Sequence, residues 1–283
     1  MTARWREWVA ALILATIVLG AVLIPLLAPT NPLRIGDVFA LRLLPPLARD
    51  SLGHLHLLGT DQFGRDILAR MMLAARVSLL VGVLGSGLAG VVGIAIGALS
   101  AWLGGAADRT MMSVTDALLS IPRLVLLLVA AALWQPGVTM VVIVLVATGW
   151  MGVARLVRAE VLSVRARPFV EAAQALGAPR WRVLWRHVLP NTLGAATVAI
   201  TLGVGGAILL ESGLSFLGLG IRPPQPSWGN MIADGRQAIV VAPWISLAPG
   251  IALIATVLAS TLLGDVLRDR LAGEVAAPLR DRA

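Results

Sequence analysis

Long apolar runs recur along the whole chain and are separated by shorter polar stretches. A helix needs about 20 mostly apolar residues to cross a bilayer, and about six runs meet that need. The pattern therefore predicts an all-α membrane protein with about six transmembrane helices. The expected spans are Val9–Ala28, Ser78–Leu103, Met112–Trp134, Val138–Leu156, Thr192–Ser212 and Trp244–Leu263.

The composition agrees with a membrane protein and argues against two other classes. Hydrophobic residues make up 58% of the 283 positions and charged residues 13%, against about 25% in soluble domains. The net charge of +8 comes from arginines that flank the apolar runs, which argues against nucleic-acid binding. The chain has no lysine, so it cannot form a phosphate-binding loop ending in Gly-Lys-Ser/Thr. We expect no ATPase site, no cofactor and no enzymatic activity in this chain.

The polar stretches divide the chain into three parts. Residues 1–76 are expected to form an N-terminal anchor helix and a periplasmic segment that begins at Asn31. The first apolar run exceeds the roughly 7–15 residues of a signal-peptide core and no A-x-A-like site follows it, so we interpret it as an uncleaved anchor. Residues 77–271 form the core, and residues 272–283 form a cytoplasmic tail.

Orientation follows from the arginines, because cytoplasmic loops carry the excess of positive charge. With the N-terminus inside, the inner segments hold 14 arginines and the outer segments hold 8. The count predicts that both termini are cytoplasmic.

Two spans carry small residues at every fourth position. Such spacing lets helices approach closely, and the alternative is a groove that lines a path. The residues are Gly85, Ala89, Gly93 and Gly97 in one span, and Ala195, Ala199, Gly203 and Ala207 in another.

The longest inner loop, residues 158–190, is predicted to form a helix, a turn and a second helix. Glu171–Leu176 is strong helix-forming sequence, Gly177 stands where helices commonly end, and Pro179 can open a second helix. Pro190 is expected to form a corner before the next span, because it lacks a backbone donor and disfavours helix at the preceding residue.

The second helix of this loop is short and amphipathic. Trp181, Leu184, Trp185 and Val188 recur at positions i, i+3, i+4 and i+7, while arginines take the other face. Such a helix can rest in the lipid interface, pack on its own neighbours or dock onto a partner protein. The residues alone leave all three interpretations open.

The same loop resembles the EAA loop of binding-protein-dependent ABC importer permeases. Glu171-Ala172-Ala173, Gly177 and Leu189-Pro190 fit the spacing of the family pattern EAA-x3-G-x9-I-x-LP. His187 departs from the pattern, which has an apolar residue there.

Further motifs resemble the C-type permease of dipeptide, oligopeptide and nickel importers, in order from about residue 57 to 271. They are Leu58–Asp66, Ala75–Leu79, Glu211–Gly220, Pro223–Met231, Leu263–Asp265 and Leu267–Asp269. The resemblance implies the type I ABC importer permease fold in a bacterial inner membrane.

The resemblance also implies partners. A periplasmic or lipid-anchored binding protein delivers peptides or a related solute such as a nickel chelate, and this chain and a second homologous permease form the path through the lipid. Two cytoplasmic ATP-binding-cassette ATPases bind the ATP and drive transport. The residues that this resemblance assigns to the ATPase-docking loop are Glu171, Ala172, Ala173, Gly177, Trp181, Leu184, Trp185 and Pro190.

Within that loop, each group of residues has an expected role. Glu171 is expected to hold the loop through hydrogen bonds or an arginine partner. Trp181, Leu184 and Trp185 are expected to supply the apolar contact with the ATPase.

Ionisable residues inside spans are costly and commonly functional. Asp116 and Arg123 are seven positions apart in the third expected span and would share one helix face about 10 Å apart. They are candidates to line the translocation path, to pair with the partner subunit or to snorkel to the interface. Glu211, near the outer end of the fifth span, is interpreted as interfacial.

Two rival interpretations find little support in the sequence. His54 and His56 supply at most half of a metal ligand set, so we expect them on the solvated surface of the outer segment. A secondary transporter, a channel or a membrane enzyme has no use for a docking loop, and the chain shows neither an internal repeat nor a catalytic motif.

Overall fold

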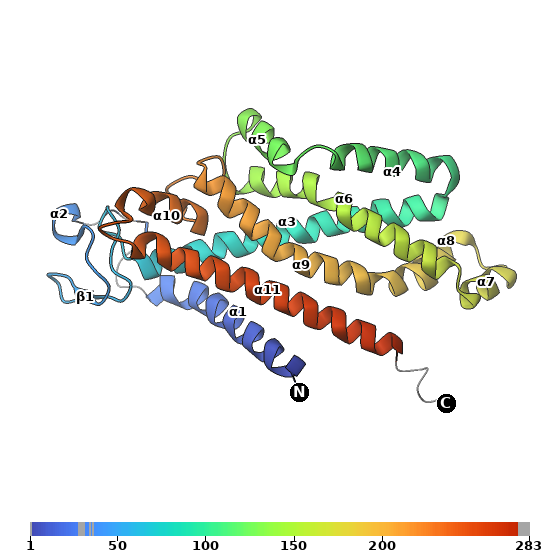
Figure 1. Cartoon of the computed structure of the whole chain (residues 1–283), viewed down its shortest axis with the longest axis horizontal. Coiled ribbons are helices and arrows are strands. Elements are labelled where there is room, and N and C mark those ends of the chain that lie inside the picture. Colours follow the sequence, from blue (N-terminus) through green and yellow to red (C-terminus); the bar gives the residue numbers. More distant parts are fainter. Residues whose placement is uncertain (1, 28–31, 34, 36, 277–283) are drawn as a thin grey trace.

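The computed structural model describes residues 2–27, 32, 33, 35 and 37–276 and consists mainly of long helices (Figure 1). Five helices in the described part are long and apolar enough to cross a membrane, which confirms the all-α membrane fold. They are α1 (Thr2–Leu27), α3 (Ile67–Leu103), α6 (Val138–Arg165), α9 (Leu189–Phe216, with the turns before it) and α11 (Trp244–Ala276).

The shorter elements lie between these long helices and at their ends. The helices are α2 (Val38–Leu41), α4 (Gly105–Leu119), α5 (Arg123–Leu133), α7 (Pro168–Ala175), α8 (Arg180–Val183) and α10 (Trp228–Gly235). Strands β1 (Ala48–Arg49) and β2 (Leu55–His56) pair antiparallel.

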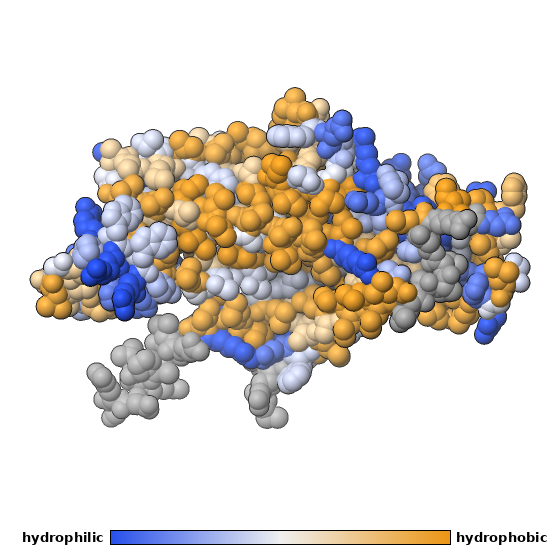
Figure 2. All heavy atoms as spheres, turned by 180° about the vertical axis from the view of Figure 1, so that it is seen from behind, coloured by the Kyte–Doolittle hydropathy of each residue, from blue (hydrophilic) through white to orange (hydrophobic). Residues whose placement is uncertain are grey.

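The long helices lie roughly parallel, with α3, α6 and α9 packed together at the centre. Helices α1 and α11 run side by side along one flank, and α4 and α5 lie along the other (Figure 1). Figure 2 shows apolar side chains across the middle of one face and hydrophilic ones gathered mostly towards the two ends. This distribution is typical of a membrane protein whose central part contacts lipid.

The third predicted span, Met112–Trp134, is not one helix, and that prediction is wrong. The chain forms α4 and α5 with a break at Ser120–Pro122. Pro122 is the N-cap of α5, with φ −55° and ψ 123°, because it has no backbone donor to continue α4 and disfavours helix at the residue before it. Asp116 and Arg123 therefore lie on different helices and do not share a face.

Helix α1 is joined to α3 through a proline. Pro25 lies inside α1 and cannot donate to the carbonyl of Ala21 four residues earlier. The Arg76 side chain replaces that donor, since its Nε donates to the Ala21 carbonyl at 2.6 Å and its Nη2 to the Val22 carbonyl at 3.0 Å. Arg76 was expected in the outer segment, but α3 begins at Ile67 and contains it. The end of the predicted anchor, residues 28–31, lies outside the described residues.

The outer motif Leu58–Asp66 forms a tight turn that precedes α3. The Asp61 carboxylate accepts the backbone N–H groups of Phe63 and Arg65 at 2.8 and 3.0 Å and the Arg65 Nε at 2.7 Å. Gly59 has φ +77°, and a Cβ there would lie 2.4 Å from the carbonyl oxygen of Leu44. These contacts give the motif a structural role, which is to form the turn before α3.

The two histidines of the outer segment are held by carboxylates. His54 Nδ1 lies 3.1 Å from Asp50, and His56, which is buried, places Nδ1 2.8 Å from Asp66. Asp66 is also the N-cap of α3 and accepts the N–H of Ala69 at 2.8 Å. His56 thus joins the hairpin to α3 and is not on the solvated surface where it was expected.

The described ends of α1 and α11 lie side by side at one end of the helix bundle, where Glu7 of α1 and Arg270 of α11 form an ion pair. The placement of both termini in the cytoplasm stays a prediction. The predicted tail begins inside α11, and residues 277–283 lie outside the described residues.

Small residues bring α3 against α6, as the packing interpretation expects. A Cβ at Gly93 would lie 2.7 Å from the carbonyl oxygen of Trp150, and one at Gly97 would lie 2.3 Å from that of Ala154. At these two positions only a hydrogen fits between the backbones.

Substitution of Gly97 tests this contact. We expect Gly97→Ala to lower the free energy of unfolding by about 1–3 kcal/mol through overpacking, measured by thermal unfolding of the purified protein in detergent. Gly87→Ala is the matched control, because it lies on the same helix and a Cβ there meets no atom within 4 Å. Equal melting temperatures for the two variants would contradict the packing assignment.

Candidate functional site

The inner loop begins with the predicted helix and turn. Helix α7 starts with Pro168 in its first turn, and it ends at a left-handed Gly177, whose φ is +78°. Gly177 N–H donates to the Gln174 carbonyl at 3.0 Å and Ala178 N–H to the Ala173 carbonyl at 3.1 Å. These two bonds form a Schellman motif, so the predicted role of Gly177 as the helix end is confirmed.

The second helix differs from expectation in how it joins the next span. Helix α8 begins at Arg180, after Pro179 as its N-cap, and continues through a π-helical turn, Leu184–Val188, directly into α9. The predicted corner at Pro190 is therefore wrong.

The π-helical turn explains how the helix passes Pro190. The Leu189 N–H donates to the Leu184 carbonyl, five residues back, and the Asn191 side chain donates to the His187 carbonyl at 2.7 Å. A wider turn thus carries the helix past the residue that lacks a backbone donor, and the Asn191 side chain adds a hydrogen bond beside it.

The second helix presents only part of its apolar residues to the outside. Trp181 and Trp185 are 50% and 63% exposed. Leu184 is 1% exposed and packs with Val183 and Val188 against α3 and α6, so it cannot supply a docking contact and that assignment is wrong. Trp185 also borders an apolar cavity of about 300 Å³ against α3.

The first helix adds exposed groups that sequence reasoning missed. Leu176 is 89% exposed and Phe169 is 41% exposed, beside exposed Glu171 and Ala172. Within the described residues, the Glu171 carboxylate makes no hydrogen bond or ion pair, so the hydrogen bonds or arginine partner expected for it are not found in this part of the chain. The position of Leu176 directly before the helix-ending Gly177 was the signal that could have drawn attention to it.

An ion pair braces α4 against α6 beside this loop. Arg158 donates to both carboxylate oxygens of Asp108, each at 2.6 Å, and Ser100 donates to the same carboxylate. The Arg158 hydrogen bonds hold the pKa of Asp108 down at about 2. Asp116 pairs with Arg155 only at 3.7 Å, with both side chains 60% exposed, so that contact contributes little.

At the opposite end of α9, Glu211 is fully buried and not interfacial as expected. Its carboxylate accepts hydrogen bonds from Ser78 of α3 at 3.0 Å and from Ser215 at 2.7 Å. Ser78 also accepts the Trp228 N–H at 3.4 Å, and a Cβ at Gly229 would clash with the Ser212 carbonyl. The two outer motifs therefore join α3, α9 and α10 into one packed junction.

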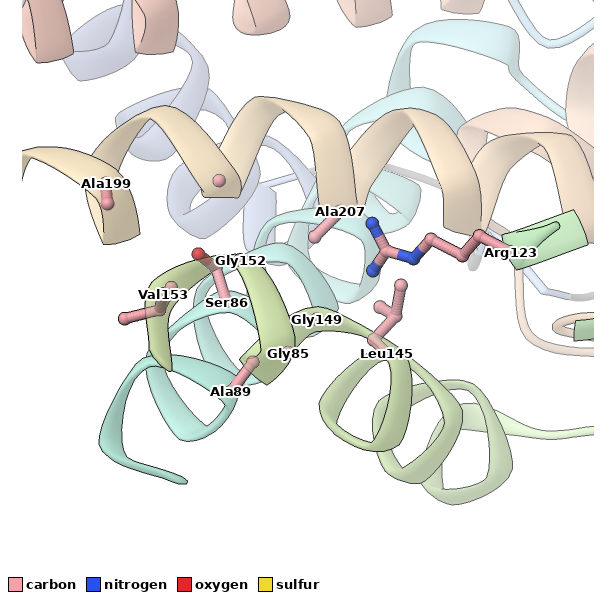
Figure 3. A pocket seen from close by; sticks show the side chains of 11 residues that line it. Gly85, Ser86, Ala89, Arg123, Leu145, Gly149, Gly152, Val153, Ala199 and Ala207 are labelled. Atoms are coloured by element: carbon pink, nitrogen blue, oxygen red, sulfur yellow. The ribbon is translucent and has the colours of Figure 1, made fainter. Parts of the chain in front are cut away.

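A cavity of about 250 Å³ lies between α3, α6 and α9 (Figure 3). Several residues of the two small-residue series border it, so the alternative of a lined groove is supported at these positions. The lining residues are Gly85, Ser86, Ala89, Arg123, Leu145, Gly149, Gly152, Val153, Ala199, Gly203 and Ala207.

Arg123 extends from α5 into this cavity (Figure 3). Its Nε donates to the Thr148 hydroxyl of α6 at 3.0 Å. Asp116, the other predicted path residue, does not border the cavity and pairs at the α4–α6 surface. Asp116 and Arg123, the two residues predicted to line the path, therefore lie at different places in the fold.

Comparison with known proteins gives matches over most of the chain. The family model described as binding-protein-dependent transport system inner membrane component matches residues 93–275. An oligopeptide transport system permease protein of Haemophilus influenzae is 39% identical over 216 residues, covering 76% of this chain and 70% of that protein. A glutathione transport system permease protein of Pectobacterium atrosepticum is 37% identical, covering 76% and 72%.

A solved structure shares the fold at low sequence identity. The MetNI methionine ABC transporter in an inward-facing conformation aligns with a TM-score of 0.58 and 18% identity, covering 70% of this chain and 95% of that chain. It supports the arrangement of helices and carries no information on what this chain binds.

The Asp108–Arg158 pair predicts a pH-dependent stability. A carboxyl whose pKa is about 2 when folded and about 3.9 when unfolded stabilises the fold above pH 4, and the contribution disappears as the pH falls towards 2. We expect Asp108→Asn to lower the free energy of unfolding by about 1–2 kcal/mol at pH 7, allowing for solvent screening. The difference should shrink at pH 3 in thermal unfolding. Asp116→Asn is the control and should change little. A pH-independent difference for Asp108→Asn would refute the assignment.

Proposed function

The chain belongs to the family of binding-protein-dependent transport system inner membrane components, and we propose that it is a permease subunit of an ATP-driven peptide importer. The names of its relatives, an oligopeptide and a glutathione permease, favour peptides over nickel chelates as the cargo. The observation that carries the proposal is one continuous helix, Arg180–Phe216. It joins an exposed helix-turn-helix at one end to the cavity between α3, α6 and α9.

We propose separate proteins for energy and for delivery. The chain has no lysine for a phosphate-binding loop, so ATP would be hydrolysed by two cytoplasmic ATPases. Trp181, Trp185 and Leu176 expose large apolar side chains on the inner loop, and such a surface suits a protein partner. A binding protein would deliver the peptide, and a second permease would complete the path.

The orientation that we propose places the inner loop and both termini in the cytoplasm. It rests on the excess of arginines at that end and on the Glu7–Arg270 ion pair, which joins the start of α1 to the last part of α11. The hairpin β1–β2 and α10 would then face the periplasm of a bacterial inner membrane.

Variants of the inner loop test the docking role. Gly177→Val places a β-branched side chain in a left-handed conformation, which costs about 1–2 kcal/mol and should change the angle between α7 and α8. Trp185→Asp removes an exposed apolar contact. Each variant should abolish ATP-dependent uptake by the assembled complex and reduce copurification of the ATPase, while membrane insertion is unchanged.

Two controls accompany these variants. Gly177→Asn should retain uptake, because asparagine tolerates the left-handed conformation and a Cβ at Gly177 meets no atom within 4 Å. His54→Ala, on the outer hairpin, should also have little effect. Wild-type uptake and ATPase association in both Gly177→Val and Trp185→Asp would remove the docking assignment.

A single cysteine tests the orientation, since the chain has none of its own. Ser51 is exposed in the outer hairpin, so a membrane-impermeant thiol reagent should label Ser51→Cys from the periplasmic side of intact cells. Labelling only from the cytoplasmic side of inverted vesicles would reverse the proposed topology.

A further inference from the structure

We propose that Arg123 is a specificity-determining residue that binds a carboxylate group of the solute as it passes through the cavity. This inference rests on the proposed function, because it requires a transported solute. It adds the chemical group that the membrane path recognises and the residue that recognises it.

The cavity has a single charged group at its wall. Among the described residues that line it, Arg123 is the only charged one, and most of the others are glycine, alanine or aliphatic residues. Helical backbones satisfy their own hydrogen bonds inside the membrane, so the backbone adds little polarity. A solute in this cavity therefore meets one cation, and one hydroxyl that already donates to the Ile200 carbonyl, in otherwise apolar surroundings.

The guanidinium is held in place but not neutralised. Thr148 donates its hydroxyl hydrogen to the Val144 carbonyl at 2.8 Å, so towards Arg123 it acts as the acceptor of the Nε hydrogen. That bond orients the side chain and leaves the four Nη hydrogens directed elsewhere. No carboxylate in the described part of the chain forms an ion pair with Arg123.

The space beside the guanidinium is kept open by a glycine. A Cβ on Gly149 would lie 3.5 Å from Nη2 of Arg123 and 3.0 Å from the Cβ of Ala89. Arg123 itself is exposed in the single chain. A solute can therefore reach the planar Nη edge of the side chain.

These features favour a carboxylate as the ligand. An unpaired cation at membrane depth is costly, and the guanidinium fork matches a carboxylate in a bidentate geometry. The cavity, at about 250 Å³, is smaller than the pockets of roughly 300–1,000 Å³ that enclose a whole small ligand. It suits one end of an extended peptide, and the C-terminal carboxylate is the anionic group at such an end.

The experiment compares matched peptides in the assembled complex. ATP-dependent uptake into proteoliposomes is measured for trialanine, for trialanine amide and for the amide of Ala-Glu-Ala, at concentrations that load the binding protein equally. We expect Arg123→Gln to lower uptake of trialanine about tenfold, the size of one lost charge-assisted interaction. Uptake of trialanine amide should change less than about twofold.

The third peptide and the additional variants locate the effect. If Arg123→Gln also lowers uptake of the Ala-Glu-Ala amide, the site accepts a side-chain carboxylate; if not, it reads the C-terminus, and either outcome supports the proposal. Arg123→Lys should retain part of the preference. Arg222→Gln is the matched control, because Arg222 is also exposed and its Nε donates to one neutral oxygen, the Gly218 carbonyl, outside the cavity.

Three results would overturn the inference. Unchanged uptake of both trialanine and its amide in Arg123→Gln would show that the cation does not bind the solute. An equal loss for both peptides, or loss of the second permease on copurification, would show that Arg123 has a structural or subunit-pairing role. Absence of ATP-dependent uptake by the wild-type complex would instead refute the proposed function itself.

Discussion

Every backbone N–H and C=O group within the membrane must find a partner inside the protein, because lipid offers none. At two prolines of this chain, a side-chain donor or a wider turn supplies hydrogen bonds beside the interruption. At Pro25 the freed carbonyl of α1 accepts the Arg76 side chain of α3. At Pro190 the backbone widens into a π-helical turn and Asn191 supplies a donor. The hydrogen bonds beside Pro25 hold α1 to α3. The π-helical turn before Pro190 keeps the long helix continuous.

Glycine and alanine serve two purposes along the same helices. At Gly93 and Gly97 they bring α3 into backbone contact with α6. One to three turns earlier in α3, Gly85 and Ala89 border an open space that also reaches Gly203 and Ala207 of α9. The open space differs from the close contact in its neighbours. Beside the open space, α9 contributes part of the wall and α5 contributes Arg123. Close packing and a potential path thus arise from one residue pattern.

Much of the fold could be predicted from the sequence, because apolar length and small-residue spacing depend on local composition. Gly177 and the helix before it were identified for the same reason, as a helix end needs only its own backbone. The errors arose where the outcome depends on distant partners. Whether Leu184 faces solvent is decided by α3 and α6, and whether Glu211 is buried is decided by serines on α3 and α9. The break at Pro122 was a local signal that the apolar run obscured.

The helix from Arg180 to Phe216 has a mechanical consequence. With a rise of 1.5 Å per residue it is about 55 Å long, and near Gly203 it touches α3, where a Cβ would lie 2.5 Å from the Ser86 hydroxyl. That contact lies about 35 Å from the inner end and about 20 Å from the outer end. If the rod tilts about it as a fulcrum, the two ends swing in opposite directions. A displacement at the inner end reaches the Glu211 junction, about 12 Å beyond the fulcrum, at about one third of its size, while the cavity beside the fulcrum hardly moves.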